Sequence, residues 1–134
     1  MEKGVKEWSD VCQTPAKTLD LGGDWSLSKD ALHWEAPTPL PGPVPEYRFA
    51  KRTFVCPKME TSTQVYVRYE GTRGGWTGVI INGRYLRRSH HNLTDFTHLN
   101  ITPWVKPDGP NEIIILGDAD RGQEITSVRL DFYE

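Results

Sequence analysis

Two eight-residue segments alternate strictly between apolar and polar side chains, and no other feature of the sequence constrains the fold as strongly. They are QVYVRYEG, residues 64–71, and SVRLDFYE, residues 127–134. The apolar positions are Val65, Val67 and Tyr69 in the first segment and Val128, Leu130 and Phe132 in the second. A period of two is typical of β-strands with one buried face and one face in water. We expect the polar positions, which include Asp131, to face solvent.

No stretch of a dozen residues has apolar side chains at helical spacing without an interrupting proline or glycine. The 134 residues include 12 Gly and 10 Pro, which suits a loop-rich β protein. Further strands are predicted at WSLS, residues 25–28, and at NEIIILG, residues 111–117. The second is apolar on both parities and is expected to be a central strand covered on both sides. In YRFAKRTFV, Phe49 and Phe54 fall on opposite parities, which predicts a bulge or two short strands.

The turns between these segments complete an all-β pattern. Asn82-Gly83 in VIINGRYL is the strongest hairpin signal, because both residues tolerate the positive φ of a type I′ turn. KPDGPNE, residues 106–112, predicts a second turn. APTPLPGPVPE, residues 36–46, is expected to cross the edge of the fold in extended form. Short strands about ten residues apart, without helices between them, indicate a β-sandwich or barrel.

The composition favours one domain spanning residues 1–134. A formal net charge of −2 gives no field that would attract nucleic acid or an anionic membrane, so neither is an expected partner. The longest apolar runs are far too short to span a bilayer, and Met1–Asp10 is too polar for a signal peptide. Cys12 and Cys56 form no recognisable disulfide or metal motif, so their pairing stays open.

The order of these segments resembles the N-terminal sugar-binding-type domain of family 2 glycoside hydrolases, a group that includes β-galactosidases, β-glucuronidases and β-mannosidases. The resemblance covers about residues 19–117 and depends on the order of individually weak motifs. The matching residues are Trp25, Pro41-Gly42, Arg52-Thr53-Phe54, Val65, Val67, Tyr69, Glu70, Gly71, Ile81-Asn82-Gly83, Phe96, Asn100-Ile101-Thr102, Asn111 and Ile113. It implies a jelly-roll β-sandwich of the galactose-binding-domain-like type.

The resemblance also implies a non-catalytic role. The acid and nucleophile of those hydrolases lie on a separate barrel, so no catalytic residue is carried over to this sequence. One departure is the loop at 89–92: the family commonly has His-x-Gly-Gly, and this chain has Ser-His-His-Asn. We expect a carbohydrate-binding module, alone or covalently linked to a glycoside hydrolase catalytic domain. The expected compartment is extracellular or periplasmic, as part of a larger protein.

A sugar site needs an aromatic face for the C–H surface of a pyranose and polar groups that converge on its hydroxyls. Two loops, EGTRGGWTG and RRSHHN, offer such groups, and the family layout brings them to one rim. The candidate ligand-binding residues are Arg73 and Trp76 in the first loop and Arg88, His90, His91 and Asn92 in the second. The alternative is that the indole of Trp76 closes the core and that the other side chains are solvated.

Four more residues are weaker candidates for a ligand-binding role. Trp34 and Tyr47 flank the proline-rich stretch and would line an open platform, with core or edge packing as the alternative. Asp118 and Arg121 lie in the polar loop GDADRGQE, for which a solvated loop is the favoured alternative.

No cofactor is expected except a structural calcium ion. Neighbouring residues on a strand point to opposite faces, so the pair of histidines at 90 and 91 is a poor zinc site. Asp20, Asp24 and Asp131 are the candidate oxygen donors for calcium, although their spacing does not single them out. A glycosidase needs two carboxyls around a cleft, and no spacing pairs the acidic residues here. Two rivals stay open: a structural accessory domain of a family 2-like hydrolase with no sugar site, and a small enzyme.

Overall fold

The described residues of this computed structural model form eleven β-strands and one short 3-10 helix. They are residues 14–44, 49–71, 76–87, 96–117 and 123–134, and at 43–44, 71, 76–77, 87, 96–97 and 123–124 the backbone alone is described. The strands are β1 (Lys17–Asp20), β2 (Gly23–Ser28), β3 (Thr38–Leu40), β4 (Gly42–Val44), β5 (Phe49–Cys56), β6 (Gln64–Gly71), β7 (Trp76–Ile81), β8 (Arg84–Arg87), β9 (Phe96–Asn100), β10 (Gly109–Gly117) and β11 (Gln123–Tyr133); the helix, η2, is Thr102–Trp104.

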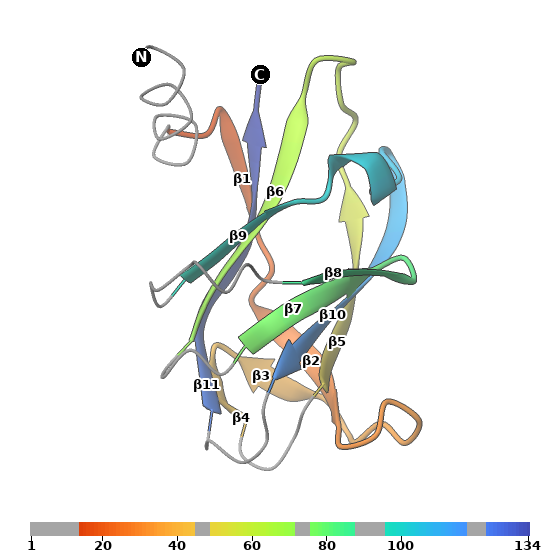
Figure 1. Ribbon diagram of the computed structural model, residues 1–134, viewed down its shortest axis with the longest axis vertical. Helices are drawn as coiled ribbons and strands as arrows, with labels where there is room; N and C mark the ends of the chain where they lie inside the picture. The colour runs from red at the N-terminus through yellow and green to blue at the C-terminus, as the bar shows by residue number, and fades with distance from the viewer. Residues whose placement is uncertain (1–13, 45–48, 72–75, 88–95, 118–122) are drawn as a thin grey trace.

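The strands build two antiparallel sheets that pack against each other, as Figure 1 shows. One sheet has the order β1-β11-β6-β9, with β4 also paired to β11. The other has the order β3-β2-β5-β10-β7-β8. The prediction of an all-β sandwich is therefore confirmed. Within the described part of the chain, no helix has the length and apolar character needed to cross a membrane.

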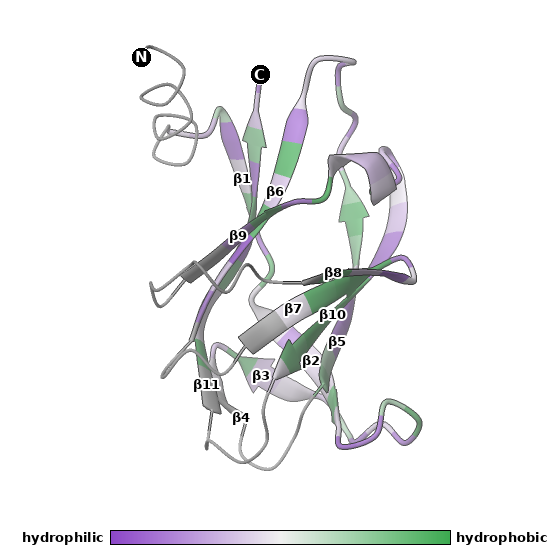
Figure 2. Cartoon of the chain, viewed as in Figure 1, coloured by the Kyte–Doolittle hydropathy of each residue, from purple (hydrophilic) through white to green (hydrophobic). Residues whose placement is uncertain are grey.

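One hydrophobic core lies between the sheets. The six-stranded sheet contributes Trp25, Leu27, Ala50, Phe54, Val79, Ile81, Ile113 and Ile115, and the five-stranded sheet contributes Val65, Val67, Tyr69, Ile125, Val128, Leu130 and Phe132. The apolar parities of the alternating segments thus face inward, as predicted. The indole N–H of Trp25 donates to the carbonyl of Leu21 at 2.9 Å, so its buried polar atom is satisfied. Figure 2 shows hydrophobic residues concentrated on the strands of both sheets.

β5 is one continuous strand, so the prediction of a bulge or two short strands is wrong. It pairs with β10 in unbroken register, from Phe49 opposite Leu116 to Cys56 opposite Gly109. Phe54 faces the core, whereas Phe49 is half-buried on the opposite parity. The two phenylalanines lie on opposite faces of one regular strand, because Phe54 belongs to the core and Phe49 does not.

β10 lies between β5 and β7, as expected for a central strand. Its buried parity carries Ile113 and Ile115, while Ile114 and Leu116 on the other parity are half-buried. The predicted cover on both faces is therefore only partial.

The Asn-Gly hairpin forms as predicted between β7 and β8. Asn82 and Gly83 have φ values of 48° and 86°, in the region that a type I′ turn requires. The Asn82 side chain also holds the turn to its neighbours: Nδ2 donates to the carbonyl of Trp104 and to Oδ1 of Asn111, both at 2.8 Å. Its Oδ1 accepts the backbone N–H of Glu112 at 2.9 Å. The hairpin is thereby fixed against β10 and η2.

The second predicted turn is also present, with Asp108 at a φ of 58°. Asn111 closes it from within. Its Oδ1 accepts the N–H of Lys106 at 2.7 Å, and its Nδ2 donates to the carbonyls of Lys106 and Gly109, both at 3.0 Å. The two asparagines of the family motif, Asn82 and Asn111, thus stabilise turns through side-chain hydrogen bonds.

The proline-rich segment passes from one sheet to the other, as predicted. β3 pairs with β2 in the six-stranded sheet, and β4 pairs with β11 in the five-stranded sheet. The Leu40–Pro41 peptide bond between them is cis.

Asp131 is 1% exposed, so the prediction that it faces water is wrong. Its carboxylate accepts from Nε of Arg129 at 2.8 Å and lies 3.6 Å from Nε2 of His98. Long side chains on the same face of the sheet cover a residue that alternation alone assigns to solvent.

Cys56 is a buried free thiol, so the open pairing with Cys12 is not formed. Its Sγ lies 3.4 Å from the carbonyl of Pro57. Burial raises the pKa of this thiol, which keeps it protonated and unreactive near neutral pH. Cys12 itself lies outside the described residues.

Candidate functional site

A groove opens in the six-stranded sheet where β2 separates from β5. The two strands pair from Ser26 opposite Lys51 to Ser28 opposite Phe49. The first half of β2, from Gly23 to Trp25, lies outside this register and pairs with β3 on its other side. The strands therefore diverge, and a hollow of about 440 Å³ lies between them, within the usual size range of small-molecule sites.

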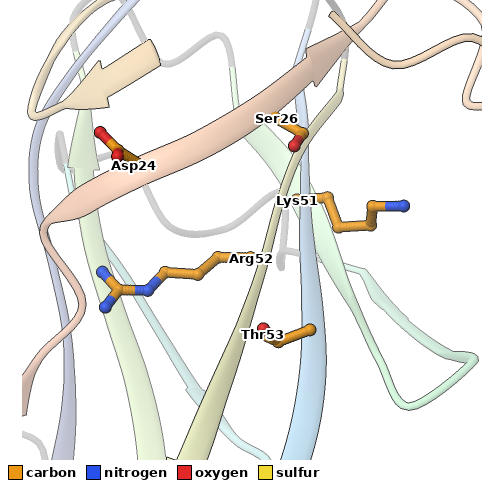
Figure 3. Close-up of a pocket in the computed structure, with 5 residues that line it drawn as sticks. All are labelled: Asp24, Ser26, Lys51, Arg52 and Thr53. Carbon is orange, nitrogen blue, oxygen red and sulfur yellow. The ribbon is translucent and has the colours of Figure 1, made fainter. Parts of the chain in front are cut away.

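Five side chains line this hollow, which we call the β2–β5 groove: Asp24, Ser26, Lys51, Arg52 and Thr53. Asp24 and Ser26 alternate with the core residue Trp25, so they project from the outer face of β2. Figure 3 shows Lys51 extending away from Arg52, whose guanidinium lies on the side of Asp24. The groove is polar, open to solvent and lined from two strands.

Arg52 forms the inner wall of the groove and is held in place by the backbone. Its Nη1 donates to the carbonyls of Leu21 and Gly22 in the segment before β2. Gly23 follows at a φ of 136°, and a Cβ there would lie 3.0 Å from the same Nη1. A side chain at this position would be strained by the backbone angle and would also crowd the guanidinium.

Trp34 lies beside the groove through its contact with Lys51. The Nζ of Lys51 is 4.1 Å from the centroid of the Trp34 ring, a cation–π geometry. Since Lys51 also lines the groove, the half-buried indole and the polar lining belong to one surface. Trp34, Tyr47 and Trp76 are the aromatic residues predicted to contact a ligand, and the structure describes the side chain of Trp34 alone among them.

The loop that leads to Trp34 is held by its own side chains. Oδ1 of Asp30 accepts the N–H groups of Leu32 at 2.8 Å and His33 at 2.9 Å, and Oδ2 lies 2.8 Å from Nδ1 of His33. The hydrogen bond from His33 lowers the pKa of Asp30 and raises that of His33. The N–H of Glu35 then donates to the carbonyl of Leu27 at 2.8 Å and returns the chain to the sheet.

The lining offers two hydroxyls, an ammonium, a guanidinium and a carboxylate as hydrogen-bond donors and acceptors, and the neighbouring indole offers an apolar face. Asp24 is the one carboxylate among the residues that line the groove. Glycoside hydrolysis uses two carboxyls around the scissile bond, and the described lining of the groove supplies one.

Most of the predicted ligand-binding residues lie outside the described residues. These are Tyr47, Arg73, Arg88, His90, His91, Asn92, Asp118 and Arg121. Trp76 begins β7, and its backbone alone is described. A site on the rim formed by these loops therefore stays a prediction.

The three candidate calcium ligands do not form a cluster. Oδ1 of Asp20 accepts the N–H of Gly22 at 2.7 Å, Asp24 lines the groove, and Asp131 is buried against Arg129. Among the residues that the structure describes, no three His, Cys, Asp or Glu side chains gather to hold a metal ion. Asp20, Asp24 and Asp131 therefore do not form the carboxylate cluster that the predicted calcium site would use.

Sequence reasoning did not select Ser26, Lys51 or Thr53 as site residues. Thr53 belongs to the family motif Arg52-Thr53-Phe54, whereas no motif marks Ser26 or Lys51. They line one hollow because β2 pairs with β5 only from Ser26 to Ser28.

Comparison with known proteins gives a match in fold. No protein-family model matches the sequence, and no curated protein matches it. The β-D-glucuronidase of Dictyoglomus thermophilum matches with a TM-score of 0.66 at 13% identity, covering 90% of this chain and 28% of that chain. The β-glucuronidase of Lactobacillus rhamnosus matches with a TM-score of 0.67 at 13% identity, covering 90% and 29%.

The β-glucuronidase of Faecalibacterium prausnitzii matches with a TM-score of 0.58 at 15% identity, covering 76% of this chain and 21% of that chain. The present chain therefore spans less than a third of the length of each of these enzymes. At such identities the shared feature is the β-sandwich.

Proposed function

We propose that this chain is a non-catalytic accessory domain of a family 2-like glycoside hydrolase and that it binds carbohydrate. The observation that carries the proposal is the fold match, which takes in 90% of this chain but only 28% of a β-glucuronidase. A domain of this kind belongs with a catalytic domain and contributes substrate contact or structural support. We propose that residues 1–134 form that one domain and that the whole protein works outside the cell or in the periplasm.

The β2–β5 groove supports binding in addition to a structural role. It combines the indole of Trp34 with Lys51 and the hydroxyl of Ser26 on one open surface. An open groove excludes little water, so the expected dissociation constants are on the order of 10–1000 μM. The ligand class is a neutral or weakly charged poly- or oligosaccharide.

Affinity electrophoresis through gels that contain soluble polysaccharides tests this function. We expect the wild-type chain to be retarded by at least one polysaccharide, and Trp34→Ala to lose most of that retardation because the stacking face is removed. Tyr85→Ala is the matched control, since this tyrosine is 48% exposed on β8, away from the groove.

A parallel Trp76→Ala variant separates the two candidate sites. Loss of retardation in this variant alone would assign binding to the loop rim and not to the groove. Failure of every polysaccharide to retard the wild-type chain would leave the purely structural accessory domain as the better account.

A further inference from the structure

The outer face of the five-stranded sheet carries a cluster of aromatic and charged side chains that the proposed groove does not use. This outer-face cluster consists of Tyr66 and Arg68 on β6, His98 on β9, and Arg129, Asp131 and Tyr133 on β11. The groove lies on the other sheet. The cluster therefore forms a separate surface.

Strand register brings these side chains together. Arg68 lies opposite His98 on one neighbouring strand and opposite Arg129 on the other. Tyr66 lies opposite Asp131 in the next row of the same face. Side chains opposite one another on one face are close enough to interact.

The three rings of the cluster fix one another. Tyr66 and His98 are stacked, with centroids 4.5 Å apart and planes at 23°. Tyr133 meets Tyr66 edge-on, with centroids 5.4 Å apart, and its hydroxyl lies 3.4 Å from Nε2 of His98. The aromatic surface is thus formed before any ligand arrives, which lowers the entropy cost of binding.

The charges of the cluster are paired within the sheet. Arg129 donates from Nε to the buried Asp131 at 2.8 Å, and Nη2 of Arg68 lies 3.4 Å from Oε2 of Glu70. Together with Glu70 on β6 and Asp20, which lies opposite Arg129 on β1, the described part of this face carries three carboxylates and two guanidiniums. A face without excess positive charge offers no track for a phosphate polymer, whereas a neutral ligand with many hydroxyls meets aromatic faces and planar hydrogen-bonding groups.

We propose that the outer-face cluster is a second contact surface for glycan, with a neutral saccharide chain resting on Tyr66 and Tyr133. The proposal depends on the carbohydrate-binding function above and adds a face to it. Arg129 is the polar contact: its guanidinium is oriented by Asp131, and 38% of its side chain stays exposed. The two faces belong to different sheets, so one domain can contact two saccharide segments.

A heteronuclear NMR titration of the wild-type chain with short neutral oligosaccharides of gluco, manno, galacto and xylo configuration tests the proposal. We expect amide shifts at Tyr66, His98 and Arg129 in addition to those around the groove. Tyr66→Ala should weaken the binding measured at this face about tenfold, as loss of one stacking partner predicts. Trp34→Ala should leave the binding at this face unchanged.

Three outcomes would overturn the proposal. Shifts confined to the groove remove the second face and leave the proposed function intact, whereas an absence of shifts with every saccharide removes both. Self-association in sedimentation experiments without saccharide, lost in Tyr66→Ala, would assign the face to protein contact. Tyr66→Phe keeps the ring and should bind like wild type, which separates the effect of ring loss from misfolding.

Discussion

His98 is held on β9 with 6% of its side chain exposed, close to charged groups of both signs. The titratable or charged groups around it are Asp131, Arg68, Arg129, Tyr133 and the stacked Tyr66. Burial lowers the pKa of this histidine, and the attraction of Asp131 does not offset that effect. The folded chain therefore holds a neutral imidazole at pH values where the unfolded chain begins to bind a proton.

This difference makes stability depend on pH. Neutral His98 makes its full contribution to the free energy of unfolding above about pH 6.5, the unperturbed pKa of histidine. That contribution is lost as the pH falls through the lowered pKa of the folded state. His33 acts in the opposite sense, because its pKa is raised. We therefore expect His33→Gln to lose more stability between about pH 7.5 and about pH 5 than His33→Gln/His98→Gln does. Urea unfolding at each pH measures the difference, and equal losses in the two proteins would contradict the assignment.

The hairpin between β7 and β8 shows how much of an element depends on two residues. Asn82 contributes three side-chain contacts as well as a positive φ, whereas Gly83 contributes conformational freedom alone. A Cβ at Gly83 would meet no atom within 4 Å. The cost of replacing this glycine is therefore a cost of backbone angle and not of space.

Gly83→Ala should destabilise the chain by about 1 kcal/mol, because alanine disfavours a φ of 86°. Gly109→Ala is the matched control at the start of β10. A Cβ there would meet only the carbonyl of Pro107 at 3.9 Å, so its effect should stay within about 0.5 kcal/mol. Equal free energies of unfolding for the two variants in urea would show that the turn geometry has been misjudged.

At the scale of the whole molecule, local sequence patterns predicted the two-sheet fold, whereas the candidate groove depends on which strands pair with each other. Alternation at Val65, Val67 and Tyr69 could be read from sequence, since a strand places every second side chain in the core. Nothing local states that β2 pairs with β5 only from Ser26 onwards, and this pairing is what brings Ser26 to Lys51. Asp131 was misassigned because Arg129 on its own strand and His98 on β9 lie against its carboxylate, which alternation alone does not state.

The continuous core predicts that both sheets unfold together. Val67 on β6 and Ile115 on β10 are fully buried in the same cluster, so neither sheet can open without exposing apolar surface of the other. We expect hydrogen exchange at the amides of these residues to report one common free energy, equal to that from a single urea transition. Residues near the groove and the outer-face cluster would then be presented from one rigid frame. Exchange through β6 at a clearly lower free energy than through β10 would instead mean that the two sheets are separate units, and the two proposed faces would move independently.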